Sequence, residues 1–457
     1  MCLARRMLTS IVFLACSLFA FPALPLADSS PLLLWQDVEK LIDAHPALGA
    51  AFGQIGVAEG ELRTSRQFPN PELGISAGES KELEGGGRKS IWDLELTIPL
   101  QWPGKYIYRG RAAGAAVEAA RFEAKAVRLE VYRELRGLYV TIAYDQENLR
   151  LRRESERQLV KLTEITKLRV DQGEARPLEL VRIEGELEEL RLEIERAASE
   201  AAAHCDQLNL WLGGKLPPEF AVAVDYANLP SPPQLDDALA RVSIDNPAVM
   251  AAQARRKQAL SSVSAEKHAV MPDLNIGAFW GEEFDTQNYG GLITCTIPLW
   301  DWNRGGISKA KSEVRLATAN SDLVEKRIKS SIIESHGRAQ NALDAIRRYQ
   351  TGILPKSEKA LADLETLYRA GECGLIDVLD ARRALIRAQL GLNAVQFDYF
   401  SAMLELNVLT GGPDHAQFID SGASLRSAHA LSRRERLSLR LPELIDASGC
   451  ERNNRET

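Results

Sequence analysis

Residues 91–100 read Ile-Trp-Asp-Leu-Glu-Leu-Thr-Ile-Pro-Leu. Apolar and polar side chains alternate from Trp92 to Ile98, which predicts a strand with one apolar and one polar face. Pro99 lacks an amide hydrogen, and the end of a strand tolerates that loss. The chain from Gly104 to Arg176 contains no proline and predicts a very long helix. A short two-faced strand therefore leads directly into a long helical segment.

The same order recurs about two hundred residues later, which indicates an internal repeat. Four short matches keep an offset of 198 to 201 residues: His45-Pro46 with Asn246-Pro247, Pro71-Glu72-Leu73 with Pro272-Asp273-Leu274, Thr97 to Leu100 with Thr296 to Leu299, and Gly173-Glu174 with Gly371-Glu372. We therefore expect two copies of one unit, at 28–228 and 229–412, joined by the proline-rich stretch 229–233.

Each copy predicts the same succession of elements. A single alanine-rich helix comes first, and then a two-stranded hairpin whose polar turn falls at 78–90 or 282–288. A long helix follows, a turn at Gly173 or Gly371 reverses the chain, and a second helix returns. The expected helices are 36–67, 109–171 and 178–212 in the first copy, and 234–270, a long helix interrupted at Pro355, and 375–409 in the second.

The ends of the chain predict export and a polar tail. Residues 1–27 carry Arg5 and Arg6, then an apolar core and small residues, the pattern of a signal peptide. Cys16 leaves lipidation as an alternative. Residues 413–457 are polar and predict disorder. The remaining cysteines are too widely spaced for a metal cluster, so we expect no cofactor. The net charge of −7, without a basic stripe, makes nucleic acid a poor partner.

The strands present a closure problem. After the signal, no uncharged apolar run reaches the ~20 residues of a membrane helix, so any membrane entry must use strands. Four strands per chain are too few for a barrel, and an open sheet in lipid leaves costly unpaired backbone groups. Three copies give twelve strands, although the strands alone also allow eight from a dimer. The long helices favour a helical tube that continues the barrel.

This succession of elements resembles the TolC-type outer membrane efflux family over residues 36–412. Within it, the chain is similar to the outer membrane channels of heavy-metal resistance-nodulation-division pumps. The residues that carry the resemblance are Asn70 to Leu73, Leu96 to Leu100 with Gly104, Lys105 and Arg109, and Tyr368 to Glu372 with Leu379 to Arg383. The resemblance implies a mainly α protein with a small β part, in which long antiparallel hairpins form a tunnel and a homotrimer closes a twelve-stranded barrel.

The resemblance also implies a location and partners. The barrel would lie in the outer membrane and the helices in the periplasm, where an adaptor protein would connect the channel to an inner-membrane pump. The cargo would be heavy-metal cations, with drug efflux or type I secretion in the same family as alternatives. Gly173, Glu174, Gly371 and Glu372 would form the periplasmic tip that contacts the adaptor.

Acidic residues just past the glycine turns are candidates for a gate. Glu179 and Asp377 are equivalent in the repeat, and Asp380 follows one turn later. Rings of carboxylates in a trimer would favour cations. The alternative is a solvated helix face or salt bridges between subunits with Arg169, Arg369 or Arg382.

Two interpretations from other functional classes remain. Gly74-Ile75-Ser76-Ala77-Gly78 matches the hydrolase pattern G-x-S-x-G, which requires a turn from strand to helix. These residues are instead expected on a strand, so we predict no enzyme. A periplasmic coiled-coil adaptor or scaffold is the other alternative. Tryptophans at the strand ends speak against it, because such residues suit a membrane interface.

Overall fold

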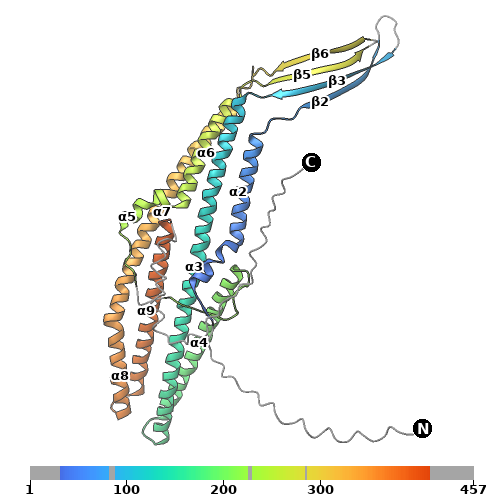
Figure 1. Ribbon diagram of the computed structural model, residues 1–457. Helices are drawn as coiled ribbons and strands as arrows, with labels where there is room; N and C mark the ends of the chain where they lie inside the picture. The colour runs from blue at the N-terminus through green and yellow to red at the C-terminus, as the bar shows by residue number, and fades with distance from the viewer. Residues whose placement is uncertain (1–30, 82–87, 225–228, 284–285, 412–457) are drawn as a thin grey trace, which may run out of the picture.

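The computed structural model describes residues 31–81, 88–224, 229–283 and 286–411. The predicted signal peptide at 1–27, Cys16 and the predicted tail at 413–457 lie outside these residues. Figure 1 shows a long molecule in which a narrow sheet extends from one end of a bundle of long helices. Helices make up most of the described chain, which confirms a mainly α fold with a small β part.

Four antiparallel strands form the sheet, in the order β2-β3-β5-β6. They span Glu72–Lys81, Arg88–Leu100, Leu274–Glu283 and Thr286–Cys295. Each copy of the repeat contributes one hairpin, and β3 pairs with β5 to join the two hairpins. The alternating stretch that begins at Ile91 is confirmed as part of β3. Ile75 on β2 and Ile293 on β6 are both exposed in the isolated chain.

The strands extend further into the predicted turns than the sequence indicated. The turn predicted at 78–90 contains the end of β2, which reaches Lys81, and the start of β3 at Arg88. In the second hairpin, β5 reaches Glu283 and β6 begins at Thr286. The polar residues at these positions are therefore strand residues, because backbone pairing between the two strands outweighs their weak intrinsic strand preference.

The internal repeat does not predict correctly where β6 ends. Thr296 to Leu299 match the end of β3 in sequence, yet β6 ends at Cys295. In β3, Pro99 and Leu100 pair with Asn275 and Leu274 of β5. On the β6 side, Cys295 already pairs with Leu274, the first residue of β5. The two stretches differ because β3 lies inside the sheet and β6 lies at its edge.

Long helices leave the sheet and return as hairpins. Helix α3, Pro103–Asp171, has 69 residues and a length of roughly 100 Å. It begins earlier than the predicted residue 109, because proline suits the first turn of a helix. Helix α4, Pro177–Trp211, returns beside it. In the second copy, α7 spans Arg304–Arg348, α8 spans Leu354–Ala370, and α9 returns as Leu375–Leu409.

The predicted interruption of the long helix at Pro355 is confirmed, and it takes the form of a π-helical turn just before the proline. A π-helical turn, η2, spans Tyr349–Ile353 and connects α7 with α8. Proline cannot donate the backbone hydrogen bond of a regular helix and its ring clashes with the preceding turn. A local π-helical segment absorbs both effects without ending the helix. The helix direction therefore continues past Pro355 to Ala370.

The prediction of one unbroken helix at the start of each copy was wrong. The first copy has α1 (Trp35–Glu39), the 3₁₀ turn η1 (Ile42–Ala44) and α2 (Pro46–Ser65). The second has α5 (Leu235–Asp245) and α6 (Pro247–Ala269). Both breaks fall at the matched dipeptides of the repeat. His45 Nδ1 accepts a hydrogen bond from the Ala47 amide at 3.2 Å, and Asn246 Oδ1 accepts one from Ala248 at 2.9 Å. These dipeptides therefore start a new helix, with a capping side chain followed by proline.

The apolar core is distributed along the helices instead of forming one centre. One cluster surrounds Trp35 and Tyr139 near the start of the described chain, and another surrounds Ile332 and Tyr399 between α7 and α9. A third lies at the far ends of the two hairpins. A two-residue parallel pair, β1 (Leu32–Leu33) with β4 (Ala221–Val222), was not predicted. Within the described ranges, no helix has the length and apolar character that crossing a membrane requires.

Candidate functional site at the helix hairpin ends

Both long hairpins reverse direction at a glycine in the left-handed conformation. Gly173 connects α3 with α4 and has a φ of 76°, and Gly371 connects α8 with α9 and has a φ of 79°. In each turn the next residue donates its amide hydrogen to a carbonyl five residues earlier, the arrangement of a Schellman motif. These bonds join Glu174 to Arg169 at 2.8 Å and Glu372 to Leu367 at 2.9 Å. The backbone conformation therefore favours glycine at both positions.

A buried tyrosine holds the two hairpin ends together. Tyr368 on α8 is only 2% exposed and packs in the third apolar cluster. Its hydroxyl lies 3.1 Å from Oγ1 of the fully buried Thr166 on α3. Arg169 donates from Nη1 to the Tyr368 carbonyl at 2.7 Å, and its guanidinium lies 4.7 Å from the centre of the tyrosine ring. One residue of the second hairpin thus makes three different contacts with the first.

Two arginines of α9 add polar contacts between the hairpins. Arg382 pairs with Glu365 of α8 and donates to Gln158 of α3 at 3.3 Å. Burial lowers the pKa of the Arg382 guanidinium, and the Glu365 carboxylate opposes that shift. The neighbouring Arg383 donates to Glu186 of α4 at 2.7 Å, and this hydrogen bond raises the Arg383 pKa. Both side chains therefore connect helices from different copies of the repeat.

Of the three acidic residues predicted for a gate, Asp377 and Asp380 are exposed at these ends and Glu179 is half-buried. Asp377 Oδ2 accepts a hydrogen bond from the Gly374 amide at 3.2 Å and thereby caps the start of α9. Glu179 occupies the equivalent place in the first turn of α4. Within the chain, Asp380 Oδ1 lies 3.4 Å from Nη1 of Arg383 on the same helix. The structure places Asp377 and Asp380 one turn apart on α9, and gives both a local partner.

The residues predicted for the tip form an exposed surface that is partly apolar. Gly173, Glu174, Gly371 and Glu372 are all exposed, and Arg169 lies 3.8 Å from Glu174. Large apolar side chains close in sequence to these four residues are also exposed to solvent, and Leu178 is 67% exposed. Grouped apolar side chains of this kind mark interaction surfaces. The other members are Leu168, Val181 and Ile376.

Tyr368 and Arg383 were named in the sequence analysis only among the residues that carry the family resemblance. Their contacts between the hairpins were not predicted. The repeat gave no signal, because Val170 occupies the place in the first copy that Tyr368 has in the second. A residue without an equivalent in the other copy is one available signal for a contact between copies. Thr166 carried no signal, since a threonine within a long helix is not unusual.

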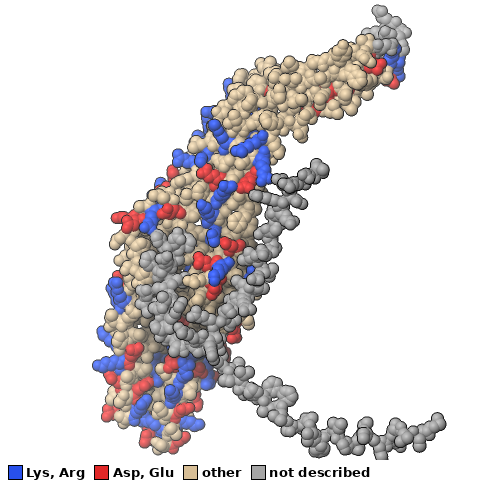
Figure 2. All heavy atoms as spheres, in the orientation of Figure 1, with Lys and Arg blue, Asp and Glu red and all other residues tan. Residues whose placement is uncertain are grey.

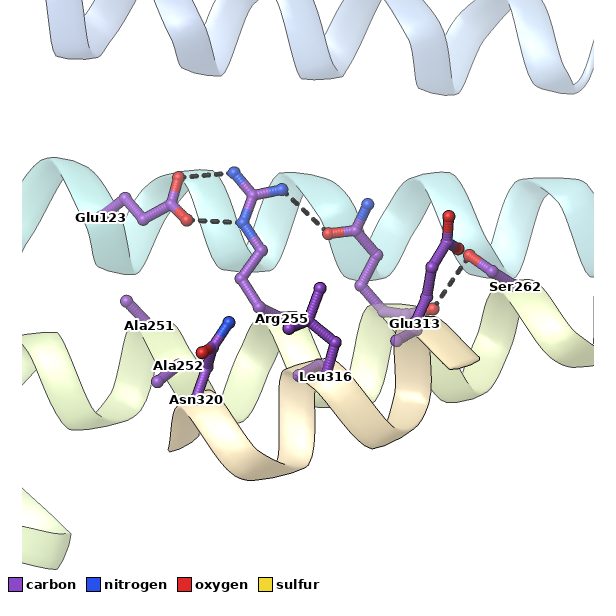
Figure 3. A pocket seen from close by; sticks show the side chains of 11 residues that line it. Glu123, Ala251, Ala252, Arg255, Ser262, Glu313, Leu316 and Asn320 are labelled. Atoms are coloured by element: carbon purple, nitrogen blue, oxygen red, sulfur yellow. Dashed lines mark hydrogen bonds and ion pairs between the residues drawn. The ribbon is translucent and has the colours of Figure 1, made fainter. Parts of the chain in front are cut away.

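A hollow in the helical wall offers no catalytic arrangement. It lies between α3, α6 and α7, has a volume of about 460 Å³ and is lined largely by small side chains. Figure 3 shows Arg255 reaching across it to Glu123, with Nη2 2.7 Å from Oε2. Ser262 donates to the Gln258 carbonyl at 3.1 Å. Ser76 of the hydrolase pattern lies within β2 opposite Asp93, not at a turn from strand to helix.

The histidines do not assemble a metal centre in the part of the chain that the structure describes. His204 Nδ1 lies 2.6 Å from Asp145 Oδ2, a contact between α4 and α3. Burial raises the pKa of the Asp145 carboxyl, and the His204 hydrogen bond opposes that shift. No group of three or more His, Cys, Asp or Glu side chains suited to a metal ion occurs among the described residues.

Comparisons with known proteins agree with this geometry. The family model described as "Outer membrane efflux protein" matches residues 38–214 and 237–412. The cobalt-zinc-cadmium resistance protein CzcC of Cupriavidus metallidurans is 26% identical over 405 residues, which cover 85% of this chain and 92% of that protein. The pyoverdine export outer membrane protein OpmQ of Pseudomonas putida is 23% identical over 376 residues, which cover 76% and 78%.

A solved structure shows the same fold. The outer membrane protein VceC of Vibrio cholerae superposes with a TM-score of 0.69 at 20% identity, over 82% of this chain and 97% of that protein. The likeness confirms the predicted fold class, that of channels with a helical tunnel and a β-barrel.

We predict that Gly371→Val loosens the second hairpin end. Valine at a φ of 79° is strained by about 1–2 kcal/mol, so local opening should increase about tenfold. Amide hydrogen exchange of residues 361–379 measures this effect. Gly185→Val on the exposed face of α4 is the control, because a side chain there meets open space in an ordinary helix. Equal exchange in wild type and Gly371→Val would contradict the prediction.

Proposed function

The chain belongs to the outer membrane efflux protein family, and on this premise we propose that it is the outer-membrane exit duct of a tripartite efflux system. The observation that carries the proposal is the four-stranded sheet, which ends in β2 on one side and β6 on the other. Each of these strands has a row of backbone groups facing outward. Lipid supplies no hydrogen-bonding partners, so a sheet placed there must close on itself.

Three copies provide a geometry that satisfies both the sheet and the helices. Twelve strands close a barrel in which β6 of one copy pairs with β2 of the next. The same threefold arrangement places the long helices side by side as the wall of a periplasmic tunnel. We propose that residues 28–228 and 229–412 are the two efflux repeats of each copy. Their two hairpins alternate around the tunnel.

We propose that this chain supplies only the passage for the cargo. Other proteins would supply the energy for transport and the connection to the inner membrane. An inner-membrane resistance-nodulation-division pump drives the cargo, and a periplasmic adaptor docks on the hairpin ends. Gly173, Glu174, Gly371 and Glu372 lie at these ends beside exposed apolar side chains, which suits a protein contact. The family is one of transport components, and we propose no catalytic step for this chain.

The hairpin ends are also the proposed gate. Asp377 and Asp380 are exposed and Glu179 is half-buried near the turns, and threefold symmetry would bring their copies toward a common axis. Carboxylates close together repel one another and attract cations. The contacts of Tyr368 and Arg383 between hairpins support a closed arrangement whose polar bonds can exchange with water when the ends separate.

The proposed cargo is heavy-metal cations. The cobalt-zinc-cadmium resistance protein is more similar to this chain, over more of its length, than the pyoverdine export protein. Acidic groups at the hairpin ends, the proposed gate, also suit a cationic cargo. Export of a siderophore or drug is the second candidate, because the pyoverdine relative shares the fold. A periplasmic scaffold is a weaker alternative, since the exposed apolar strands would have no role in water.

We predict that the purified protein is a trimer. Three copies close the barrel, and each chain alone leaves two sheet edges in contact with lipid or detergent. Native mass measurement in detergent should give three times the mass of the processed chain. A stable monomer or dimer as the sole species would refute the closure argument.

Loss of the gene should make cells sensitive to divalent metals. Growth of a deletion strain on cobalt, zinc and cadmium should fall at lower metal concentrations than growth of the parent, and the gene in trans should restore it. Dyes, antibiotics and a siderophore are tested in parallel. Sensitivity confined to these organic compounds would contradict the metal proposal and favour the second candidate.

The gate proposal predicts a small cation-selective conductance that periplasmic multivalent cations block. Asp377→Asn should reduce both selectivity and block, because it removes a charge from the tip. Asparagine keeps an oxygen that can accept the Gly374 hydrogen bond, so the start of α9 should remain intact. Single-channel recording of the reconstituted protein measures both quantities.

Glu72→Gln is the matched control for this charge change. Glu72 is the first residue of β2, where the sheet meets the helices, so the long helices separate it from the hairpin turns. Its selectivity and cation block should equal those of wild type. If Asp377→Asn behaves in the same way, the carboxylates at the tip are ordinary solvated residues and the gate lies elsewhere.

A further inference from the structure

Basic side chains gather where the sheet meets the helices. Figure 2 shows this face of the sheet almost free of charge until its far end, with Lys and Arg at the adjoining helix ends. Six exposed cations lie at the end of α2, the start of α3, the end of α6 and the start of α7, and we call them the collar. They are Arg66, Arg109, Arg111, Lys267, Arg304 and Lys311.

The helix ends that carry the collar lie at one level of the molecule. Arg66 packs beside Gly110, where a Cβ would lie 3.3 Å from its Cγ. Asn303, just before α7, donates to the Glu266 carboxylate of α6. His268 of α6 stacks on Tyr108 of α3, with ring centres 3.7 Å apart. These contacts tie α2 to α3, α3 to α6, and α6 to α7.

Acidic groups at this level are already used by other partners. Asp273 pairs with Lys105 at 2.8 Å, Glu266 accepts from Asn303, and Asp301 accepts from the Asn303 amide at 2.8 Å. Ion pairs among the described residues include no member of the collar. Arg109 donates to Gln101 Oε1 at 2.7 Å and to the Lys105 carbonyl at 3.3 Å, both neutral acceptors. The collar cations therefore have no ion-pair partner among the described residues, and Glu266 and Asp301, bonded here to the neutral Asn303, offset only part of their six positive charges.

Aromatic side chains accompany the collar. Trp300 is 91% exposed and Trp302 is also exposed, between the end of β6 and the start of α7. The ring of Trp102 covers Gly104, where a Cβ would overlap it at 1.4 Å. Arg111 lies 5.3 Å from the Tyr108 ring centre. Indole and phenol rings beside basic groups are typical of the interface between lipid tails and water.

The length of the sheet fits the same boundary. A strand of ten residues, such as β5, spans roughly 33 Å, and a tilted one covers an apolar layer of about 25 Å. Ile276 and Ile293 lie within that layer and are exposed. The collar adjoins its helical end, which is where phospholipid headgroups of the facing leaflet would lie.

We propose that the collar binds the phosphate groups of anionic phospholipids and thereby sets the depth of the sheet in the membrane. The inference rests on the proposed membrane location of the sheet. Guanidinium groups donate two parallel hydrogen bonds to phosphate oxygens, and lysine adds a point charge. A net negative headgroup is favoured over a zwitterionic one, because the six collar cations outnumber Glu266 and Asp301, the acids named at this level that have no ion pair. The attraction should weaken as salt increases.

The test uses the full-length protein and two lipids with identical acyl chains, phosphatidylglycerol and phosphatidylcholine. Native mass spectrometry in detergent counts bound molecules of each. The collar variant is Arg109→Gln, Arg111→Gln and Lys311→Gln. The control is Arg153→Gln, Lys161→Gln and Lys167→Gln, three exposed cations elsewhere on α3. Wild type and control should prefer phosphatidylglycerol, and the collar variant should lose that preference by about fivefold for each cation removed.

Three outcomes would overturn the proposal. They are equal binding of the two lipids by wild type, an unchanged preference in the collar variant, and displacement of phosphatidylglycerol by inorganic phosphate at the same concentration. If the triple variant does not assemble, Arg111→Gln alone should still lower the preference about fivefold, and an unchanged value refutes the proposal. Insertion of wild type into phosphatidylcholine vesicles separately tests the membrane proposal, since insertion without a lipid preference refutes only the collar.

Discussion

The outward-facing backbone groups of β2 and β6 are the constraint on which the rest of the structure depends. A four-stranded antiparallel sheet in water can leave its edges hydrated, but the same sheet in lipid cannot. Its apolar side chains are exposed on the isolated chain, so they need either lipid or other copies around them. Closure by copies of the same chain satisfies both demands. The position of the sheet also limits where the helices begin, because α3 starts at Pro103 soon after β3 ends at Leu100, and α7 starts at Arg304 after β6 ends at Cys295.

The helical half of the chain is long and has no single large apolar core to stabilise it. Its apolar residues form separate clusters along the helices, each joining only a few neighbours. Such a structure can change at one end without disturbing the other. The hairpin ends combine glycine turns with polar contacts, and the buried Tyr368 is their centre. The gate proposed above requires an element with two arrangements of similar free energy, and polar bonds that water can replace would suit such an element.

Charge is arranged along the long axis in agreement with this division. The sheet carries few charged groups, the helix ends next to it carry the collar, and the far hairpin ends carry many acids and arginines (Figure 2). At the hairpin ends arginines pair with acids of neighbouring helices, which stabilises contacts between those helices. At the collar the cations lack acidic partners among the described residues. The same residue type therefore serves packing at one end and faces an external surface at the other.

The sequence by itself determined the element types, the repeat and the turns. Period-two alternation, absence of proline and paired glycines are local properties, and local sterics decide them without the rest of the chain. The sequence could not show that His45-Pro46 and Asn246-Pro247 begin new helices, because proline suits a first turn as well as a kink. Only the tertiary structure decided two other features. One is the end of β6 at Cys295, opposite the first residue of β5, and the other is the contact of Tyr368 with Thr166. Both depend on which segments lie side by side, and residues 202 positions apart in the chain give no local sign of meeting.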